Sequence, residues 1–138
     1  MRLSGKIFNG GKYWPIEVPL LGVFTQGKSR KDAYFMIADA IEELVNKPGF
    51  KISVFPGKDE YFEIAASDEA VLIAFLLRRE RLRSGMTLEQ VAERLGARSA
   101  NAYARYEQGR TTPTIAKLSQ LMSAVSPKGD VVIQQCQA

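Results

Sequence analysis

Histidine is absent from the 138-residue sequence, and cysteine occurs once, at Cys136. Without histidine the chain cannot carry Ser-His or Cys-His catalysis or a histidine-bearing zinc site. One cysteine forms neither an internal disulfide nor a CxxC redox pair. The N-terminus has no apolar segment typical of a secretory signal, and the longest apolar run, Ala70 to Leu77, is too short to span a bilayer. We therefore expect a cytoplasmic protein that is not an enzyme and has no metal, no cofactor and no membrane contact.

The positive charge between Arg78 and Arg110 is carried by arginine alone. The formal net charge is +4, and between Arg78 and Arg110 eight arginines and no lysine stand against four glutamates. A guanidinium group binds phosphate or guanine through two parallel hydrogen bonds, which the ammonium group of lysine does not. This composition favours a nucleic-acid partner, and a solvated helix surface is the alternative.

The first half, residues 1–66, has the pattern of a small domain of strands and one helix. Five stretches have the composition of strands: Leu3–Asn9, Lys12–Val18, Leu20–Gln26, Phe50–Phe55 and Tyr61–Ala66. Gly10-Gly11, between the first two, predicts a two-residue hairpin turn. A helix is predicted from Ser29, with Asp32 as its capping-box partner, to a stop at Pro48-Gly49, because apolar residues recur at helical spacing between them.

The second half, residues 67–138, has the pattern of helices separated by glycine. Four helices are predicted, opened by Ser67-Asp68, Thr87, Ser99 and Pro113 or Thr114, and ending at Arg83, Leu95, Gln108 and about Val125. Val131-Val132-Ile133 is predicted as a terminal strand. The expected fold class is α+β, with a small strand-strand-strand-helix-strand domain followed by an all-α domain that contains a helix-turn-helix.

The segment from Thr87 to Gly109 carries the helix-turn-helix signal, in which two short helices flank a glycine-containing turn. Five side chains give the two helices their inward faces: Val91, Ala92, Leu95, Tyr103 and Tyr106. Three stretches resemble the Cro and phage-repressor type of this motif: Leu88-Glu89-Gln90-Val91-Ala92, Leu95-Gly96, and Arg105-Tyr106-Glu107-Gln108-Gly109-Arg110 with Pro113 after it. The resemblance covers about Ala70 to Val125. The turn Gly96-Ala97-Arg98-Ser99 is one residue longer than the usual turn of the motif.

The start of the second helix of this motif enters the major groove of DNA, where asparagine pairs with adenine and arginine with guanine. The candidate base-reading residues are therefore Arg98, Ser99, Ala100, Asn101 and Arg105. The candidate phosphate contacts are Thr87, Gln90, Arg110 and Thr112. Thr87 and Gln90 are also predicted to form a capping box. Glu107 is interpreted as the ion-pair partner of a nearby arginine rather than as a base reader.

Gly22 to Ser29 matches the phosphate-loop pattern G-x-x-x-x-G-K-[ST] in full. Two observations argue against a nucleotide site there. Val23-Phe24-Thr25 has the composition of a strand, whereas a phosphate nest needs a turning backbone. The first half also has one helix, too few for the several βαβ units of such a fold. We interpret the match as fortuitous.

A second resemblance involves residues that overlap this phosphate-loop pattern. Gly10-Gly11-Lys12-Tyr13-Trp14, Leu21 to Gly27 and the helix from Ser29 to Leu44 resemble the HicB family of bacterial antitoxins. The resemblance implies a partial ribonuclease-H-like domain in residues 1–66 that binds and blocks HicA, a small basic RNA-cleaving toxin. Residues 67–138 would then dimerise and repress the operon. Leu3–Asn9 has no carboxylate, so the metal-dependent catalysis of a ribonuclease H is not expected.

Aromatic side chains anchor protein interfaces, so Tyr13, Trp14 and Phe24 are the candidate toxin contacts. The alternative is that Trp14 and Phe24 belong to the core. The leading hypothesis is a HicB-like antitoxin of a type II toxin-antitoxin pair. It would block a HicA-like toxin and repress its own operon, binding double-stranded operator DNA as a homodimer or a larger even oligomer. The alternative is a stand-alone repressor whose first domain senses a ligand or only dimerises. A nucleotide-binding or nuclease enzyme is the third hypothesis.

Overall fold

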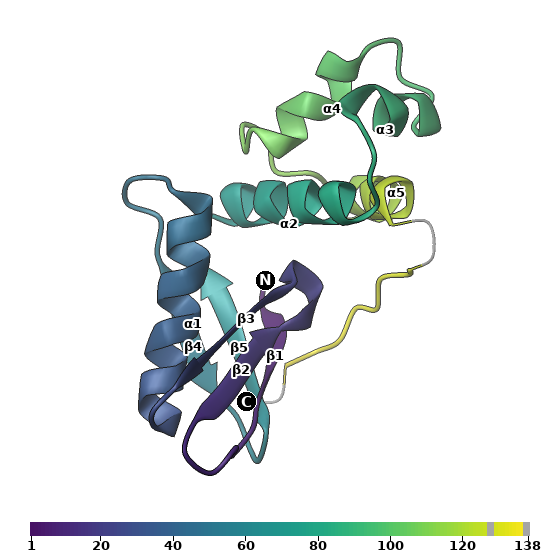
Figure 1. Ribbon diagram of the computed structural model, residues 1–138. Coiled ribbons are helices and arrows are strands. Elements are labelled where there is room, and N and C mark those ends of the chain that lie inside the picture. Colours follow the sequence, from purple (N-terminus) through teal and green to yellow (C-terminus); the bar gives the residue numbers. More distant parts are fainter. Residues whose placement is uncertain (127–128, 137–138) are drawn as a thin grey trace. The chain divides into compact units, whose positions relative to one another are not determined.

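The computed structural model describes residues 1–126 and 129–136. The chain divides into two compact units, Met1–Leu72 (unit 1) and Ile73–Ala138 (unit 2), whose elements are labelled in Figure 1. Unit 1 holds all the strands, and unit 2 holds only helices among its described elements. The boundary between the units falls within helix α2 (Glu69–Arg83).

Unit 1 is an antiparallel sheet with one helix on one face. Its strands are β1 (Leu3–Ile7), β2 (Trp14–Val18), β3 (Val23–Gly27), β4 (Ile52–Pro56) and β5 (Tyr61–Ala66), in the spatial order β3-β2-β1-β5-β4. Alternate strand residues such as Ile7 and Ile16, which lie opposite one another, are fully buried. The helix α1 (Arg30–Val45) covers this face and buries Ala33, Ile37 and Ile41 against it (Figure 1).

The predicted strand-strand-strand-helix-strand order of this domain is wrong, because two strands follow the helix. β4 and β5 pair as a hairpin, and β5 also pairs with β1, so it lies between β1 and β4. The reason is the turn before β5, where Asp59 has a left-handed backbone (φ 56°) and the N–H of Tyr61 donates to the carbonyl of Lys58 (3.1 Å). The chain reverses there, and the returning strand takes the place beside β1.

The predicted hairpin between the first two strands is present, but its turn lies one residue further along. The N–H of Gly10 donates to the carbonyl of Tyr13 (3.0 Å), so the tight turn is centred on Gly11 and Lys12. Gly11 has φ 85°, a left-handed conformation that costs glycine little. The two glycines therefore have different roles, because Gly11 lies in the turn and Gly10 pairs with Tyr13 across it.

Helix α1 begins where the sequence predicts, at the N-cap Ser29. Its Oγ accepts from the N–H of Asp32 (3.0 Å), and the carboxylate of Asp32 accepts from the N–H of Lys28 (2.8 Å) rather than from that of Ser29. Gly27, at the end of β3, lets the helix approach the sheet. A Cβ on Gly27 would lie 2.3 Å from the backbone nitrogen of Ala33, a distance at which the helix must move.

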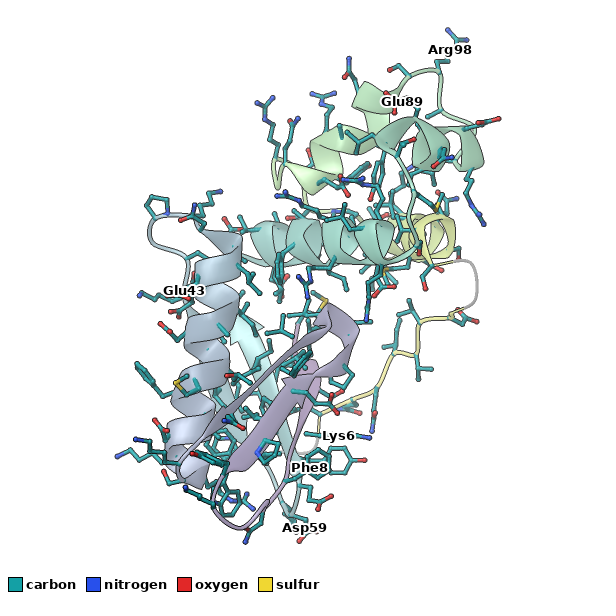
Figure 2. All side chains as sticks on the ribbon, viewed as in Figure 1. Lys6, Phe8, Glu43, Asp59, Glu89 and Arg98 are labelled. Atoms are coloured by element: carbon teal, nitrogen blue, oxygen red, sulfur yellow. The ribbon has the colours of Figure 1, made fainter. Side chains whose placement is uncertain are left out.

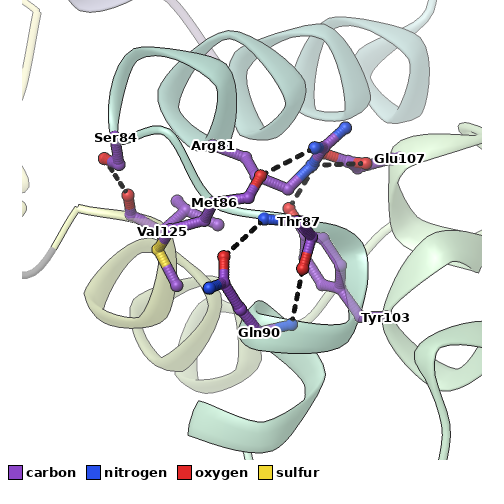
Figure 3. Close-up of polar contacts among 8 residues, drawn as sticks. All are labelled: Arg81, Ser84, Met86, Thr87, Gln90, Tyr103, Glu107 and Val125. Atoms are coloured by element: carbon purple, nitrogen blue, oxygen red, sulfur yellow. Dashed lines mark hydrogen bonds and ion pairs between the residues drawn. The ribbon is translucent and has the colours of Figure 1, made fainter.

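Unit 2 contains most of α2 together with α3 (Leu88–Arg94), α4 (Ala100–Glu107) and α5 (Ile115–Val125). The last three helices begin at the predicted N-caps, Thr87, Ser99 and Thr114. Its core includes residues from every helix of the unit: Leu76, Leu77, Val91, Ala92, Tyr103, Leu121, Met122, Ala124 and Val125. The hydroxyl of Ser84, just after α2, donates to the carbonyl of Val125 (2.6 Å) and ties the end of α2 to the end of α5 (Figure 3).

The predicted terminal strand Val131–Ile133 is not formed. The described residues 129–136 have no regular secondary structure. A strand needs a second strand whose N–H and C=O groups complement its own, and the described elements of unit 2 are all helical.

Candidate nucleic-acid interface

Helices α3 and α4 pack together through small and aromatic side chains. Val91 and Ala92 of α3 and Tyr103 of α4 are buried. In the turn between them Gly96 has φ 69°, and the N–H of Ala97 donates to the carbonyl of Ala92 (2.9 Å). Glycine takes this left-handed conformation without a Cβ clash, so it ends α3 cleanly and lets the chain turn into α4. The predicted helix-turn-helix arrangement is confirmed.

The N-terminus of α3 is closed by the predicted capping box (Figure 3). The N–H of Gln90 donates to Thr87 Oγ1 (3.1 Å), and the N–H of Thr87 donates to Gln90 Oε1 (2.8 Å). Both side chains are exposed. The hydroxyl hydrogen of Thr87 and the amide nitrogen of Gln90 are therefore held at the surface as donors, which is what their predicted role as phosphate contacts requires.

The outward face of α4 carries polar side chains. Asn101 and Arg105 are exposed, and because they are one helical turn apart they project from the same side. Ser99 is exposed at the N-cap, and its side chain makes no capping hydrogen bond. Arg98 projects outward from the turn before α4 (Figure 2). Four of the five predicted base-reading side chains are thus at the surface, and the fifth, Ala100, is half-buried.

A buried ion pair ties α4 to α2 (Figure 3). Arg81 Nε donates to Glu107 Oε1 at 2.8 Å and to Oε2 at 3.2 Å, and the two side chains are only 13% and 7% exposed. Arg81 Nη1 donates to the carbonyl of Met86 (3.0 Å), and the hydroxyl of Tyr103 donates to Glu107 Oε1 (3.2 Å). Burial and then the adjacent Glu107 carboxylate raise the pKa of Tyr103, so its phenol stays protonated. The prediction that Glu107 pairs with a nearby arginine is confirmed.

The sequence did not single out Arg81 from the other arginines of its helix. A signal was present, because Arg81 is four residues after Leu77, which is fully buried, and so lies on the same inward side of α2. An arginine on a buried helix face needs an anion, and Glu107 supplies it. Arg78, by contrast, is exposed.

The two remaining candidate phosphate contacts, Arg110 and Thr112, follow α4 in the connection to α5 and are exposed. Gly109, with φ 69°, turns the chain between α4 and Arg110. In residues 1–126 and 129–136 neither side chain enters a hydrogen bond or an ion pair, so the donors of both face solvent. Two of the candidate phosphate contacts therefore lie at the start of α3, and the other two lie in the connection that follows α4.

The candidate toxin contacts of unit 1 do not form one surface. Phe24 is 79% exposed, so the alternative that it belongs to the core is wrong. Trp14 is half-buried beneath the guanidinium of Arg30, which lies 5.2 Å from the ring centroid. Phe24 lies opposite Glu17, the neighbour of buried Ile16 and Val18, so Phe24 and Trp14 point to opposite faces of the sheet. Tyr13, in the hairpin turn, is 38% exposed.

The phosphate-loop pattern forms an extended strand rather than a loop. Val23–Gly27 is β3, and the N–H of Lys28 and the hydroxyl of Ser29 belong to the cap of α1. Successive N–H groups of a strand point in opposite directions, so they do not converge on one anion. In the part of the chain that the structure describes, no three carboxylate or cysteine side chains gather as a metal site.

The described residues include no helix with both the length and the apolarity to cross a membrane. Residues 72–126 match the family model of a helix-turn-helix domain, a range that contains all of α3, α4 and α5. A comparison with curated proteins finds no match. The family match includes none of residues 1–71, so the resemblance of the first half to the HicB family stays a prediction. Residues 72–126 of this chain form a DNA-binding helix-turn-helix domain.

Proposed function

We propose that the chain is a transcriptional repressor that binds a specific double-stranded operator through α4. The observation that carries this proposal is the exposed polar face of α4, where Asn101 and Arg105 project from one side. The opposite side of the helix is fixed by the buried contact of Glu107 with Arg81. A rigid helix with free amide and guanidinium groups on its outer face fits the major groove, where base edges carry the sequence.

The two exposed side chains predict what kind of half-site is read. Asparagine pairs bidentately with adenine and arginine with guanine. Four helical residues rise about 6 Å, which is close to two base-pair steps of about 3.4 Å each. Asn101 and Arg105 are therefore proposed to read an adenine and a guanine about two base pairs apart. Thr87, Gln90 and Arg110 would hold the phosphates and fix the register.

The operator is proposed to be a palindrome that binds two copies of the chain. Helix-turn-helix dimers read half-sites about one turn of DNA, or about 34 Å, apart. Two-fold symmetry of the protein then matches two-fold symmetry of the DNA.

The test measures binding to the DNA upstream of the chain's own gene by fluorescence anisotropy. Asn101→Ala and Arg105→Ala should each weaken specific binding by about 1–3 kcal/mol and relax the preference at one base pair. Arg78→Ala is the matched control, because it removes the same charge from an exposed position on α2 and should leave the base preference unchanged. If both α4 variants bind the operator like the unaltered chain, the assignment of α4 as the reading helix is wrong.

A second function, proposed for unit 1, is that of an antitoxin that blocks a HicA-like toxin by covering it, without catalysis. The observation that favours it is Phe24, 79% exposed on the edge strand β3, since exposed aromatic side chains anchor interfaces. The chain would be purified from its source cell and its co-eluting proteins identified by mass spectrometry. A stoichiometric small basic protein, toxic on its own and released by Phe24→Ala, would support this function. Operator binding with no such partner would favour the stand-alone repressor.

A further inference from the structure

A cleft lies in unit 1 at the N-terminal end of α1, and neither of the two proposed functions assigns a ligand to it. Its volume is about 500 Å³, which is within the range of small-molecule sites. Three segments line it: the first residue of α1, the hairpin of β1 and β2, and the turn that leads into β5. All three belong to unit 1, so the cleft is complete within that unit.

The floor of the cleft is the face of the sheet that α1 covers further along. Ile7 of β1 is fully buried there, and its N–H donates to the carbonyl of Glu60 (2.9 Å). Glu60 therefore lies opposite Ile7 on the side of β5. On the side of β2, Trp14 is two residues before Ile16, the partner of Ile7, so the indole projects to the same face. The indole of Trp14 and the side chain of Glu60 thus flank one floor.

Arg30, the first residue of α1, lines the cleft with part of its guanidinium unused. Its Nη1 donates to the carbonyl of Asp59 (3.1 Å) and to the hydroxyl of Tyr34 (3.3 Å), and the group lies 5.2 Å from the ring centroid of Trp14. These contacts hold the guanidinium in one place. Among the residues that the structure describes, Nε and Nη2 have no partner. These two nitrogens form the edge that binds two acceptors side by side.

Two carboxylates line the same cleft without a cation beside them. Asp59, which is labelled in Figure 2, and Glu60 are exposed. Within the described part of the chain neither carboxylate enters a hydrogen bond or an ion pair, although Arg30 lines the cleft with them. A guanidinium edge and carboxylates that share one space without pairing leave room between them. A ligand that fits there has acceptors on one edge and donors on another.

We propose that this cleft binds a guanine base. Guanine has two acceptors, O6 and N7, on one edge, and the donors N1–H and the exocyclic amino group on the adjoining edge. The free edge of Arg30 takes the acceptors, the carboxylate of Glu60 takes the donors, and the indole of Trp14 gives the base an aromatic surface. Adenine has a donor beside N7, which opposes the two donors of arginine. The proposal concerns unit 1 alone and does not depend on operator binding by α4.

The experiment titrates the full chain with guanosine. Binding is followed by calorimetry and by the fluorescence of Trp14, which is the only tryptophan of the sequence and reports on the cleft directly. Guanosine should quench this fluorescence and bind at least about 10-fold more tightly than adenosine or cytidine. Glu60→Gln should weaken guanosine binding by at least about 10-fold, because hydrogen bonds to a charged acceptor are lost. Glu43→Gln, at an exposed position on α1, is the matched control and should bind guanosine like the unaltered chain.

Inosine tests whether Glu60 contacts the base or acts through the fold. Inosine is guanosine without the exocyclic amino group, so it lacks one of the two donors assigned to Glu60. Glu60→Gln should therefore weaken inosine binding less than guanosine binding, whereas a change in the shape of the cleft would weaken both equally. Arg30→Lys keeps the positive charge but loses the paired donors, and it should bind guanosine at least about 10-fold more weakly.

A single-stranded RNA of uridines with one central guanosine distinguishes two sources of the base, with an all-uridine strand as its control. Quenching of Trp14 by the guanosine-containing strand alone, lost in Glu60→Gln, would support a site for guanine within RNA. Binding of guanosine without binding of this strand would support a site for a free nucleoside or nucleotide. The proposal is overturned if guanosine at millimolar concentration does not bind, if all nucleosides bind alike, or if Glu60→Gln binds guanosine like the unaltered chain. Binding of a zwitterionic amino acid in place of guanosine would also overturn it.

Discussion

Replacing Glu107 tests whether α4 is held in place by the buried ion pair. The carboxylate accepts from Arg81 through both oxygens and from the hydroxyl of Tyr103, and its side chain is 7% exposed. Glu107→Ala leaves the guanidinium of Arg81 in a largely dry position with no anion beside it. Breaking a buried pair from one side costs about 3–5 kcal/mol. Because a domain is stabilised by only about 5–15 kcal/mol in total, this loss should bring unit 2 close to unfolding.

Two further variants separate the charge from the shape. Glu107→Gln keeps the length of the side chain and an acceptor for Tyr103 but removes the anion. It should therefore destabilise the chain less than Glu107→Ala does. The double variant Arg81→Met/Glu107→Leu removes both charges and fills the space with apolar atoms. Such replacements of buried pairs are often neutral or stabilising, and the double variant loses in addition the hydrogen bond from Arg81 to the carbonyl of Met86, at about 1 kcal/mol. It should therefore be more stable than Glu107→Ala.

The assay is urea unfolding of the full chain, followed by the circular dichroism of its helices, with operator affinity measured on the same samples. Glu93→Ala, an exposed glutamate on α3, is the control and should unfold like the unaltered chain within about 0.5 kcal/mol. If Glu107→Ala lowers the free energy of unfolding by less than about 1 kcal/mol, water solvates the guanidinium of Arg81 in that variant. The argument that the buried ion pair holds α4 in place is then refuted.

Two other predictions concern a titrating group and a close approach. Burial and the Glu107 carboxylate raise the pKa of Tyr103, so the folded state holds this proton more tightly than the unfolded chain does. The resulting stability is complete below about pH 10, the ordinary pKa of tyrosine, and is lost as the pH rises above it. The unaltered chain should therefore lose stability relative to Tyr103→Phe between about pH 9.5 and 11.5 in urea unfolding, and a constant difference would contradict this. Gly27→Ala sets a Cβ 2.3 Å from the backbone nitrogen of Ala33 and should destabilise unit 1 by about 1–3 kcal/mol or more in thermal unfolding. An unchanged unfolding temperature would show that α1 shifts freely on the sheet.

Local chemistry in the sequence located most helix and strand positions. Ser29, Thr87 and Thr114 cap the helices that they were predicted to open, because a side-chain oxygen at that position satisfies a backbone N–H three residues later. Gly96 ends α3 because a left-handed residue is required there. These signals act over three or four residues, so one sequence is enough to read them. The same holds for the outward face of α4, where helical spacing places Asn101 and Arg105 on one side.

What sequence reasoning could not predict depends on contacts between segments far apart in the chain. The strand stretches of the first half were found, but which of the last two pairs with β1 does not follow from the turn between them, because the same turn joins the two strands in either order. Phe24 shows the same limit, because its alternation with Val23 is visible in the sequence, whereas the face that α1 covers is not.

The ion pair of Arg81 and Glu107 lies between these two cases. Helical spacing from Leu77 places Arg81 on the buried side of α2, and spacing from Tyr103 places Glu107 on the buried side of α4. Taken alone, each position puts a charged side chain on the buried face of a helix, which is unfavourable. Together they require one another, because a buried guanidinium and a buried carboxylate are tolerated only as a pair. Both charges lie inside the unit, so neither of them is available to contact DNA, and Asn101 and Arg105 remain the exposed polar side chains of α4 on which the proposed function depends.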